Sequence, residues 1–327
     1  MAIVTSGRVR TLMGVALAAV TVLVATACTS GGSDAAPELE NPTLRVGYIP
    51  LIDDAPLFIG QSKGIWKKHG INLEPVALSN DQEVITQLKN GTLDVAIASY
   101  VTMFKAAANG TELEIEGEAY QAAKNTIALV NLPDGRSKTL KDVARPTILV
   151  SSIEDVDTLT TRSALQTIGV TDINFVVSPF EQMGQQLQDK KADAAWIVEP
   201  YLTQAQQILG ANILLDTARG ATQDFPISGY VSSKKYANEN RQKLEQFRKA
   251  LSESQGLAAN PLTVQQVLPE FIKQIDVSTA SLVNIGRFPT TLNAIRLQRV
   301  ANLMDTSNMI PGALQVSKLM PPGYAAS

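Results

Sequence analysis

The side chains best suited to chemistry in this sequence are carboxylates and hydroxyls that follow short apolar runs. Asp53 and Asp54 follow the apolar residues of 44–49, and Glu199 follows the apolar run 194–198. A carboxylate in such a loop can accept hydrogen bonds from the N–H groups of a ligand. It can equally cap the helix that starts beside it, so the position alone leaves both roles open.

The composition offers little for catalysis. The chain has one histidine, His69, and one cysteine, Cys28. No intrachain disulfide, Cys/His zinc site or Cys–His nucleophilic pair can therefore be assembled. A Ser-His-Asp triad would have to use His69, which lies in the basic turn 66–70. We therefore expect neither an enzyme nor a cofactor or metal site.

Strand–loop–helix steps must place the candidate side chains at one edge. The stretch Leu44–Pro56 reads as a buried strand, a loop with two carboxylates, and a helix that starts at Pro56, because proline suits a first helical turn. Ligands of open α/β sheets bind at the carboxyl ends of the strands. We expect a cleft lined by five such loops: Leu51–Ala55, Ser79–Asp81, Ser99–Thr102, Ser152–Thr158 and Glu199–Tyr201.

The candidate ligand-binding residues are polar and aromatic side chains of these loops and of one strand end: Asp53, Asp54, Ser79, Asp81, Ser99, Tyr100, Tyr120, Ser152, Asp155, Thr158, Glu199 and Tyr201. Helix capping is the alternative for Asp53, Asp54 and Asp81. The acids of 154–157 stand in a first helical turn, where the helix dipole favours them. Trp196 lies in mid-strand and reads as a core residue.

The N-terminal residues read as an export signal. Residues 1–27 combine Arg8 and Arg10 with the apolar run Leu12–Ala27, which is shorter than the ~20 residues of a spanning helix. Ala25–Cys28 resembles a bacterial lipoprotein box, so we expect lipidation of Cys28 and attachment to the outer face of a membrane. A plain secretory signal is the alternative. Residues 28–42 are small, polar and proline-bearing, which is typical of a flexible tether.

Two series of βαβ units follow, with short loops that favour largely parallel sheets. Four residues of the first series recur in the second at a constant offset: Gln87, Leu88, Asp94 and Ala96 return as Gln186, Leu187, Asp193 and Ala195. We predict an α/β fold of two doubly wound lobes joined by a double crossover. Lobe 1 is predicted at 43–131 and 229–327, with a helical C-terminal tail packed on it, and lobe 2 at 132–228.

Three motifs resemble the substrate-binding proteins of ABC importers in the nitrate/sulfonate/taurine and thiamine-precursor-like group. They are Gly47–Pro50 with Ala55-Pro56 and the following Gly64–Ile71, then Leu88–Ala96, and Asp193–Tyr201. The resemblance covers about Leu44 to Met320. It implies a periplasmic-binding-protein type II fold, a ligand held between the lobes, and hinged closure that presents the liganded form to a permease and its ATPase.

The charges of the candidate loops narrow the expected class of ligand. Net charge is −3 without a basic block, which gives no sign of a nucleic-acid partner, and the five loops contain no Lys or Arg. An anion such as nitrate or a sulfonate would depend on helix N-terminal N–H groups and hydroxyls. The carboxylates favour an amine or amino-heterocycle, for example a pyrimidine vitamin precursor or an amino-sulfonate.

Two other functions are open to this fold. A ligand-binding sensor subunit would bind and close in the same way as an importer component. An enzyme relative that makes the thiamine pyrimidine uses a cysteine-rich motif and a histidine, whereas this chain has no cysteine after Cys28. We therefore expect a non-enzymatic, monomeric, exported binding protein.

Overall fold

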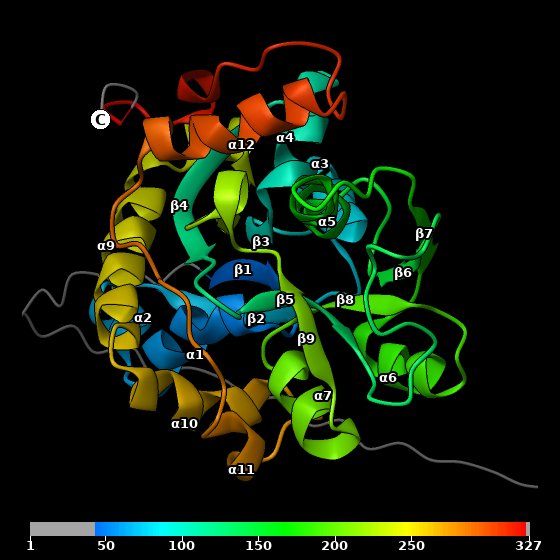
Figure 1. The fold of residues 1–327 in the computed structure, drawn as a ribbon. Coiled ribbons are helices and arrows are strands. Elements are labelled where there is room, and N and C mark those ends of the chain that lie inside the picture. Colours follow the sequence, from blue (N-terminus) through cyan, green and yellow to red (C-terminus); the bar gives the residue numbers. More distant parts are fainter. Residues whose placement is uncertain (1–42, 325–327) are drawn as a thin grey trace, which may run out of the picture. The chain divides into compact units, whose positions relative to one another are not determined.

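Two five-stranded sheets form the framework of residues 43–324, which are the residues that the computed structural model describes (Figure 1). The strand order is β2-β1-β3-β10-β4 in the first sheet and β7-β6-β8-β5-β9 in the second. The export signal, the tether and Cys28, all predicted within 1–42, lie outside the described residues.

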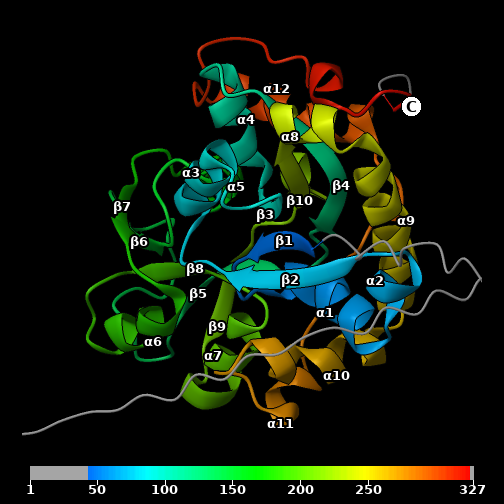
Figure 2. The same ribbon diagram turned by 180° about the vertical axis from the view of Figure 1, so that it is seen from behind.

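The first sheet takes strands from two distant parts of the chain. Its strands are β1 (Thr43–Tyr48), β2 (Asn72–Ala77), β3 (Val95–Ser99), β4 (Leu113–Gln121) and β10 (Pro226–Ser233). β1 and β2 pair in parallel and lie side by side in Figure 2. The helices connecting these strands are α1 (Ala55–Ser62), α2 (Ile65–Lys68), α3 (Asp81–Asn90) and α4 (Tyr100–Ala108).

The second sheet comes from one continuous stretch. Its strands are β5 (Ile127–Asn131), β6 (Thr147–Val150), β7 (Asn174–Val177), β8 (Ala194–Val198) and β9 (Asn212–Asp216). The helices are α5 (Val156–Gln166), α6 (Phe180–Gln188) and α7 (Tyr201–Leu209). Trp196 of β8 is buried, and its indole N–H donates to the Thr160 and Thr217 hydroxyls, so it belongs to the core of this lobe.

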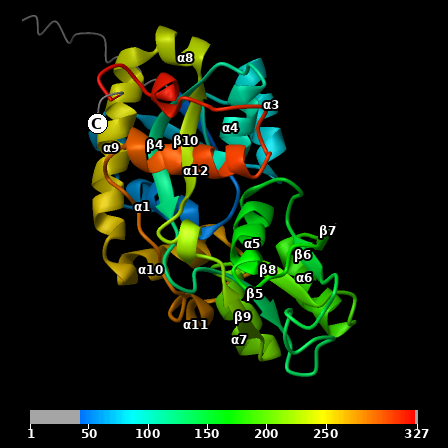
Figure 3. The same cartoon turned by 45° about the horizontal axis from the view of Figure 1, so that its top comes forward.

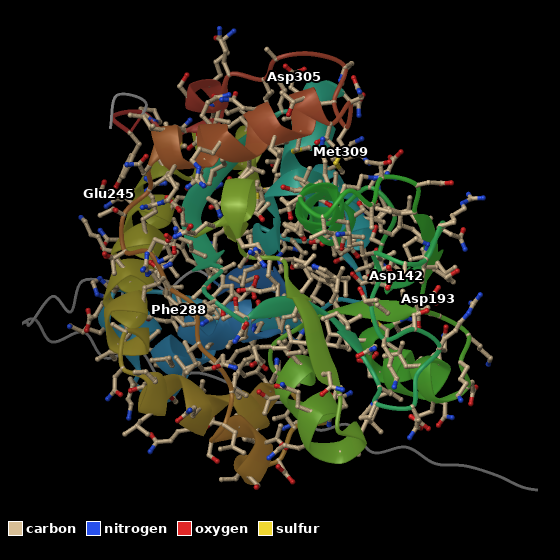
Figure 4. The ribbon with its side chains drawn as sticks, viewed as in Figure 1. Asp142, Asp193, Glu245, Phe288, Asp305 and Met309 are labelled. Carbon is tan, nitrogen blue, oxygen red and sulfur yellow. The ribbon has the colours of Figure 1, made fainter. Side chains whose placement is uncertain are left out.

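The two sheets repeat one arrangement. In each, the fourth strand of the order (β10 or β5) runs antiparallel to both of its neighbours, and the other pairs are parallel. The repeated aspartates occupy equivalent places: Asp94 accepts from the Arg45 N–H at 2.8 Å, and Asp193 accepts from the Thr147 N–H at 2.8 Å. Asp193 lies beside the start of β8 in Figure 4. The internal repeat in the sequence is therefore a structural repeat.

The predicted two-lobed α/β fold with a double crossover is confirmed. The chain crosses between the sheets after β4 and again after β9. Strand β5 pairs with β8 and β9 of the second sheet, although the sequence prediction places residues 43–131 in lobe 1. β9 was not predicted, because its short apolar run directly follows α7 and Gly210 and reads as a loop.

The C-terminal helices cover the first sheet, as predicted. They are α8 (Lys234–Glu239), α9 (Arg241–Ala258), α10 (Pro261–Phe271), α11 (Val277–Ala280) and α12 (Ala294–Thr306). α9 contacts β4 and α1, and α12 contacts α4 and β10 (Figure 3). Over residues 43–324, no helix combines the length and apolarity that crossing a membrane requires.

Three buried glutamates of β4 fasten this helical layer to the sheet. Alternate residues of a strand face the same side, and Glu114, Glu116 and Glu118 are each 2% exposed or less. Each pairs with cations from the C-terminal segment: Glu114 with Lys234 and Arg241, Glu116 with Arg248, and Glu118 with Arg296. The tail is thus an integral part of the first lobe.

Candidate functional site

Five aspartates gather where strands of both sheets end. Asp53 and Asp54 follow β1, Asp81 opens α3, and Asp155 and Asp157 lie at the start of α5 after β6. We call these five residues the acidic cluster. Burial first, and the negative charge of other members second, raise the pKa of Asp54, Asp81 and Asp157. The second cause shows that these carboxyls lie near one another.

Asp53 lies in the 3-10 turn Ile52–Asp54 after β1, and its side chain contacts strand β10. It is 7% exposed, and its Oδ2 accepts a hydrogen bond from the Ser228 hydroxyl. Burial raises the pKa of Asp53 to about 6, against the opposing effect of the Ser228 hydrogen bond. Asp53 therefore titrates near neutral pH.

Asp54 is buried and only half satisfied. Its Oδ2 accepts from the Leu51 N–H at 3.2 Å in the 3-10 turn Ile52–Asp54, and its side chain does not cap α1. Burial, followed by the charge of Asp53, raises its pKa well above the ordinary value.

Asp81 is the first residue of α3, whereas Asn80 caps that helix by accepting from the Glu83 N–H. One oxygen of Asp81 accepts from the Ser99 N–H at 3.1 Å. Loss of hydration, followed by the charge of Asp155, raises the pKa of Asp81 well above the ordinary value. Asp81 thus adds negative charge beside the carboxyl end of β3.

Asp155 joins the two lobes. It caps α5 by accepting from the Val156 N–H at 2.6 Å. It also accepts from the hydroxyls of Ser99 (2.5 Å) and Thr102 (2.7 Å) in the first turn of α4. Beside it, Lys105 of α4 contacts the Glu154 carboxylate at 2.8 Å. These contacts hold α4 and α5 together across the interlobe boundary.

The remaining polar groups at the start of α5 are bound to one another. Asp157 accepts from the Ser151 hydroxyl and from the N–H groups of Ser152 and Thr158. Burial, followed by the charge of Asp155, raises its pKa to about 7. The Thr158 hydroxyl accepts from the Asp155 N–H and donates to its carbonyl. These hydrogen bonds therefore stabilise the N-terminus of α5.

Glu199 is fully occupied by protein groups. Its two oxygens accept from the Thr203 N–H and hydroxyl, at 3.0 and 2.9 Å, and from the Asn284 N–H and side-chain amide, at 3.0 and 3.2 Å. Burial raises its pKa, although these hydrogen bonds oppose the shift. Glu199 therefore ties α7 to the segment before residue 285.

A Glu199→Gln variant is expected to lower the free energy of unfolding by about 1–3 kcal/mol, because the amide replaces an acceptor with a donor among buried donors. Urea denaturation would measure the loss, with the exposed Glu239→Gln as control. Ligand affinity is a separate readout. Unchanged affinity in this variant would exclude a direct contact between Glu199 and the ligand.

The other candidates are distributed around this region. Tyr120 is buried, accepts from the Gly286 N–H at 2.7 Å and packs on Phe288, which Figure 4 labels. Tyr201 stacks on Phe180 and donates to Glu181. Tyr100 is buried against Gly229 in the first lobe. Ser79 is exposed and Ser152 half-buried.

Sequence reasoning missed three partners of the candidate residues: Ser228, Asn284 and Thr203. Ser228 lies near the start of β10, whereas Asn284 lies in an irregular segment without a sequence signal. His69 lies elsewhere and pairs with Glu253 at 2.8 Å. Among the described residues, no group of three or more His, Cys, Asp or Glu could hold a metal ion.

Solved structures share this fold. The ligand-binding component of an ABC-type import system from Staphylococcus aureus, solved with zinc bound, has a TM-score of 0.74 at 12% identity, over 87% of this chain and 98% of that one. The alkanesulfonate-binding protein SsuA from Xanthomonas axonopodis, bound to MOPS, has a TM-score of 0.71 at 15% identity, over 85% and 98%. The fold is thus that of the type II periplasmic binding proteins.

Sequence comparison adds a curated relative and a family. Over 39 residues the chain is 46% identical to the bicarbonate-binding protein CmpA of Synechococcus elongatus, a match that spans 12% of this chain and 9% of that protein. The profile of the NMT1-like family matches residues 37–268. Because this match spans well over half of the sequence, the protein belongs to the NMT1-like family.

Proposed function

We propose that this protein is the extracytoplasmic solute-binding component of an ABC import system, and that its ligand is a small organic molecule with an amine or amino-heterocycle. The observation that carries the ligand class is the acidic cluster between the lobes. The interactions that most shift the pKa of Asp53, Asp54, Asp81 and Asp157 involve no Lys or Arg of the described residues. Buried negative charge without a cation favours a cationic ligand.

Anions are the competing ligand class, because the similar proteins include an alkanesulfonate-binding and a bicarbonate-binding protein. An anion would need free hydroxyls and helix N–H groups. Two of the hydroxyls available to it are already used: Ser99 donates to the Asp155 carboxylate and Thr158 to the Asp155 carbonyl. These hydrogen bonds argue for the amine.

Transport follows from closure in this proposal. Ligand binding stabilises the closed arrangement of the lobes, predicted at 43–131 with 229–327 and at 132–228, and the closed form engages a permease and its ATPase. Lipidated Cys28 and the tether of 28–42 hold the protein at the outer face of the membrane. A sensor subunit would share the binding step but act without a permease.

The test is a thermal shift of the purified protein against chosen compounds: putrescine, the aminopyrimidine precursor of thiamine, thiamine, taurine, methanesulfonate, nitrate and bicarbonate. A ligand at about 100 times its dissociation constant should stabilise the fold by about 2.7 kcal/mol. We expect the largest shift from an amine or aminopyrimidine. A shift caused only by methanesulfonate, nitrate or bicarbonate would contradict the proposed ligand class.

A further inference from the structure

The buried carboxylates near the interlobe boundary differ in how their oxygens are satisfied, and Asp53 accepts from the Ser228 hydroxyl with Oδ2. In Asp155, Asp157 and Glu199, both oxygens accept hydrogen bonds from protein donors. Asp54 differs: it is 1% exposed, and its Oδ1 has no hydrogen-bond partner within residues 43–324. A buried carboxylate oxygen without a donor is costly, so this atom needs an explanation.

The structural repeat makes the difference sharper. Asp54 precedes α1 in the first lobe, and Asp155 precedes α5 at the matching place in the second. Asp155 caps its helix, whereas the side chain of Asp54 makes no cap hydrogen bond to α1. Oδ2 of Asp54 instead accepts from the Leu51 N–H and caps the preceding 3-10 turn. Capping therefore accounts for Oδ2 but leaves Oδ1 unexplained.

The groups around Asp54 come from four elements. Asp53 lies beside it, and Asp81 of α3 is the other acid that raises its pKa. The phenols of Tyr48 on β1 and Tyr230 on β10 both have raised pKa values, with burial as the first cause and the charge of Asp54 as the second. The Tyr230 hydroxyl is also buried without a partner among the described residues. Of the charged groups that act on Asp54 itself, none is a cation.

Aromatic rings lie next to this site. The Tyr48 and Phe58 rings pack in a T-shaped arrangement with centroids 5.0 Å apart, and Phe58 stacks on Phe271 at 4.2 Å. These ring contacts are made within the protein. What marks the position is therefore an unpartnered acceptor beside other acids.

Building on the solute-binding function above, we propose that Asp54 Oδ1 accepts a hydrogen bond from a protonated nitrogen of the ligand, and that this cation displaces a proton from the Asp53–Asp54 pair. Without ligand the pair carries one proton, and in the complex both carboxylates are ionised. The displaced proton passes to solvent, and no covalent bond forms between protein and ligand. The ligand class is a primary amine or protonated amino-heterocycle with at least one N–H.

The proposal also fixes the sign of the pH dependence of ligand affinity. The pKa of Asp53 is about 6 and that of Asp54 is raised well above its ordinary value, so the pair retains a proton at pH 6. Raising the pH removes this proton before the ligand arrives. Affinity for an amine that stays protonated over this pH range therefore increases with pH until the free pair is ionised. Burial also raises the pKa of Asp81, and raises that of Asp157 to about 7. These acids therefore also gain negative charge as the pH rises, which strengthens the same trend.

The experiment measures binding by calorimetry at pH 6, in phosphate and in bis-Tris. Because the two buffers differ in ionisation enthalpy, the difference between the measured heats counts the protons released. The probe is whichever of putrescine and the aminopyrimidine precursor gives the larger thermal shift. Asp54→Asn keeps the size of the side chain but removes its charge. Asp172→Asn is the matched control on an exposed acid, whose side chain is 69% exposed.

We expect the wild-type protein to release protons on binding, and Asp54→Asn to lose at least tenfold in affinity together with the proton release. Asp172→Asn should match the wild type in both. If Asp54→Asn binds the amine tightly and releases the same number of protons, the assignment to Asp54 is wrong, although the solute-binding function stands. This result is expected if a buried water donates a hydrogen bond to Oδ1. Binding of methanesulfonate or bicarbonate, with neither amine bound, would overturn both the assignment to Asp54 and the proposed amine ligand class, while solute binding itself would stand.

Discussion

Replacing Arg248 with methionine is expected to lower the free energy of unfolding by about 3 kcal/mol at pH 8, because it leaves a buried carboxylate without its cation. Arg248 Nη1 lies 2.5 Å from Glu116 Oε2, and the Ser232 hydroxyl donates to the other oxygen at 2.6 Å. The Glu116 side chain is fully buried, and that of Arg248 is 14% exposed. Methionine retains most of the aliphatic packing, so the charge is what changes.

The loss should depend on pH with a definite sign. Burial raises the pKa of Glu116 to about 7, although Ser232 and Arg248 oppose the shift. At pH 5 the folded protein therefore holds Glu116 protonated, and removing Arg248 strands no charge. Above pH 7 the variant must either bury an unpaired carboxylate or keep it protonated at a cost. We expect a smaller loss at pH 5 than at pH 8.

Urea denaturation at the two pH values measures both effects. Lys249→Met is the matched control, because Lys249 is the next residue of α9 and pairs at 2.7 Å with Glu245, which projects from α9 in Figure 4. Both side chains are more than half exposed, and such a pair contributes about 0.3–0.5 kcal/mol. Equal losses for the two variants, or a loss at position 248 that ignores pH, would contradict this account.

Replacing Asp155 with alanine is expected to weaken ligand binding by about 30-fold, because it removes two interlobe hydrogen bonds. Ser99 and Thr102 would each lose a charged acceptor. A loss of about 2 kcal/mol from the closed state corresponds to this change in affinity when only the closed state holds ligand. Calorimetric titration of the variant and of the wild type with the same ligand would measure the loss.

Asp155→Ala removes the α5 cap as well, which costs about 1 kcal/mol of folding stability. Thr102→Val separates the two effects, because it removes one interlobe hydrogen bond and leaves the cap intact. We expect about a fivefold loss of affinity for Thr102→Val without the loss of folding stability. Suppose that Thr102→Val binds ligand as tightly as the wild type, and that Asp155→Ala lowers only the folding stability. Asp155 would then act only as the cap of α5, and its hydrogen bonds to α4 would not contribute to ligand binding.

The fold could be predicted because its signals are local. Short apolar runs, helix caps and the repeated Asp-x-Ala step fall within a few residues of the elements they specify. The crossover could not be placed as reliably, because β5 has the same apolar pattern whichever sheet it joins. Its pairing with β8 and β9 depends on residues far along the chain.

Only the outline of the candidate site could be predicted from the sequence. The strand ends predicted which loops carry carboxylates, but the state of each carboxylate depends on distant partners. Ser228 is 175 positions from Asp53, Asn284 is 85 from Glu199, and Ser99 is 56 from Asp155. No periodicity links such pairs, so the sequence could not separate the occupied acid Glu199 from the half-satisfied acid Asp54.

The strand order of the first sheet also sets a sequence of events during synthesis. β10 lies between β3 and β4, and β4 pairs with no other strand of that sheet. β3 ends at Ser99, whereas β10 begins at Pro226. At about 5–20 residues per second, β10 is made about 6–25 s after β3.

The second sheet can meanwhile be completed, because residues 127–216 are continuous. During this interval one edge of β3 has unpaired backbone groups, and such an edge is open to pairing with other chains. The glutamates of β4 also lack their cations, since all four come from residue 234 onwards. The first lobe is therefore the first to be synthesised in part and the last to be completed. Its incomplete sheet is the part of the nascent chain most exposed to aggregation.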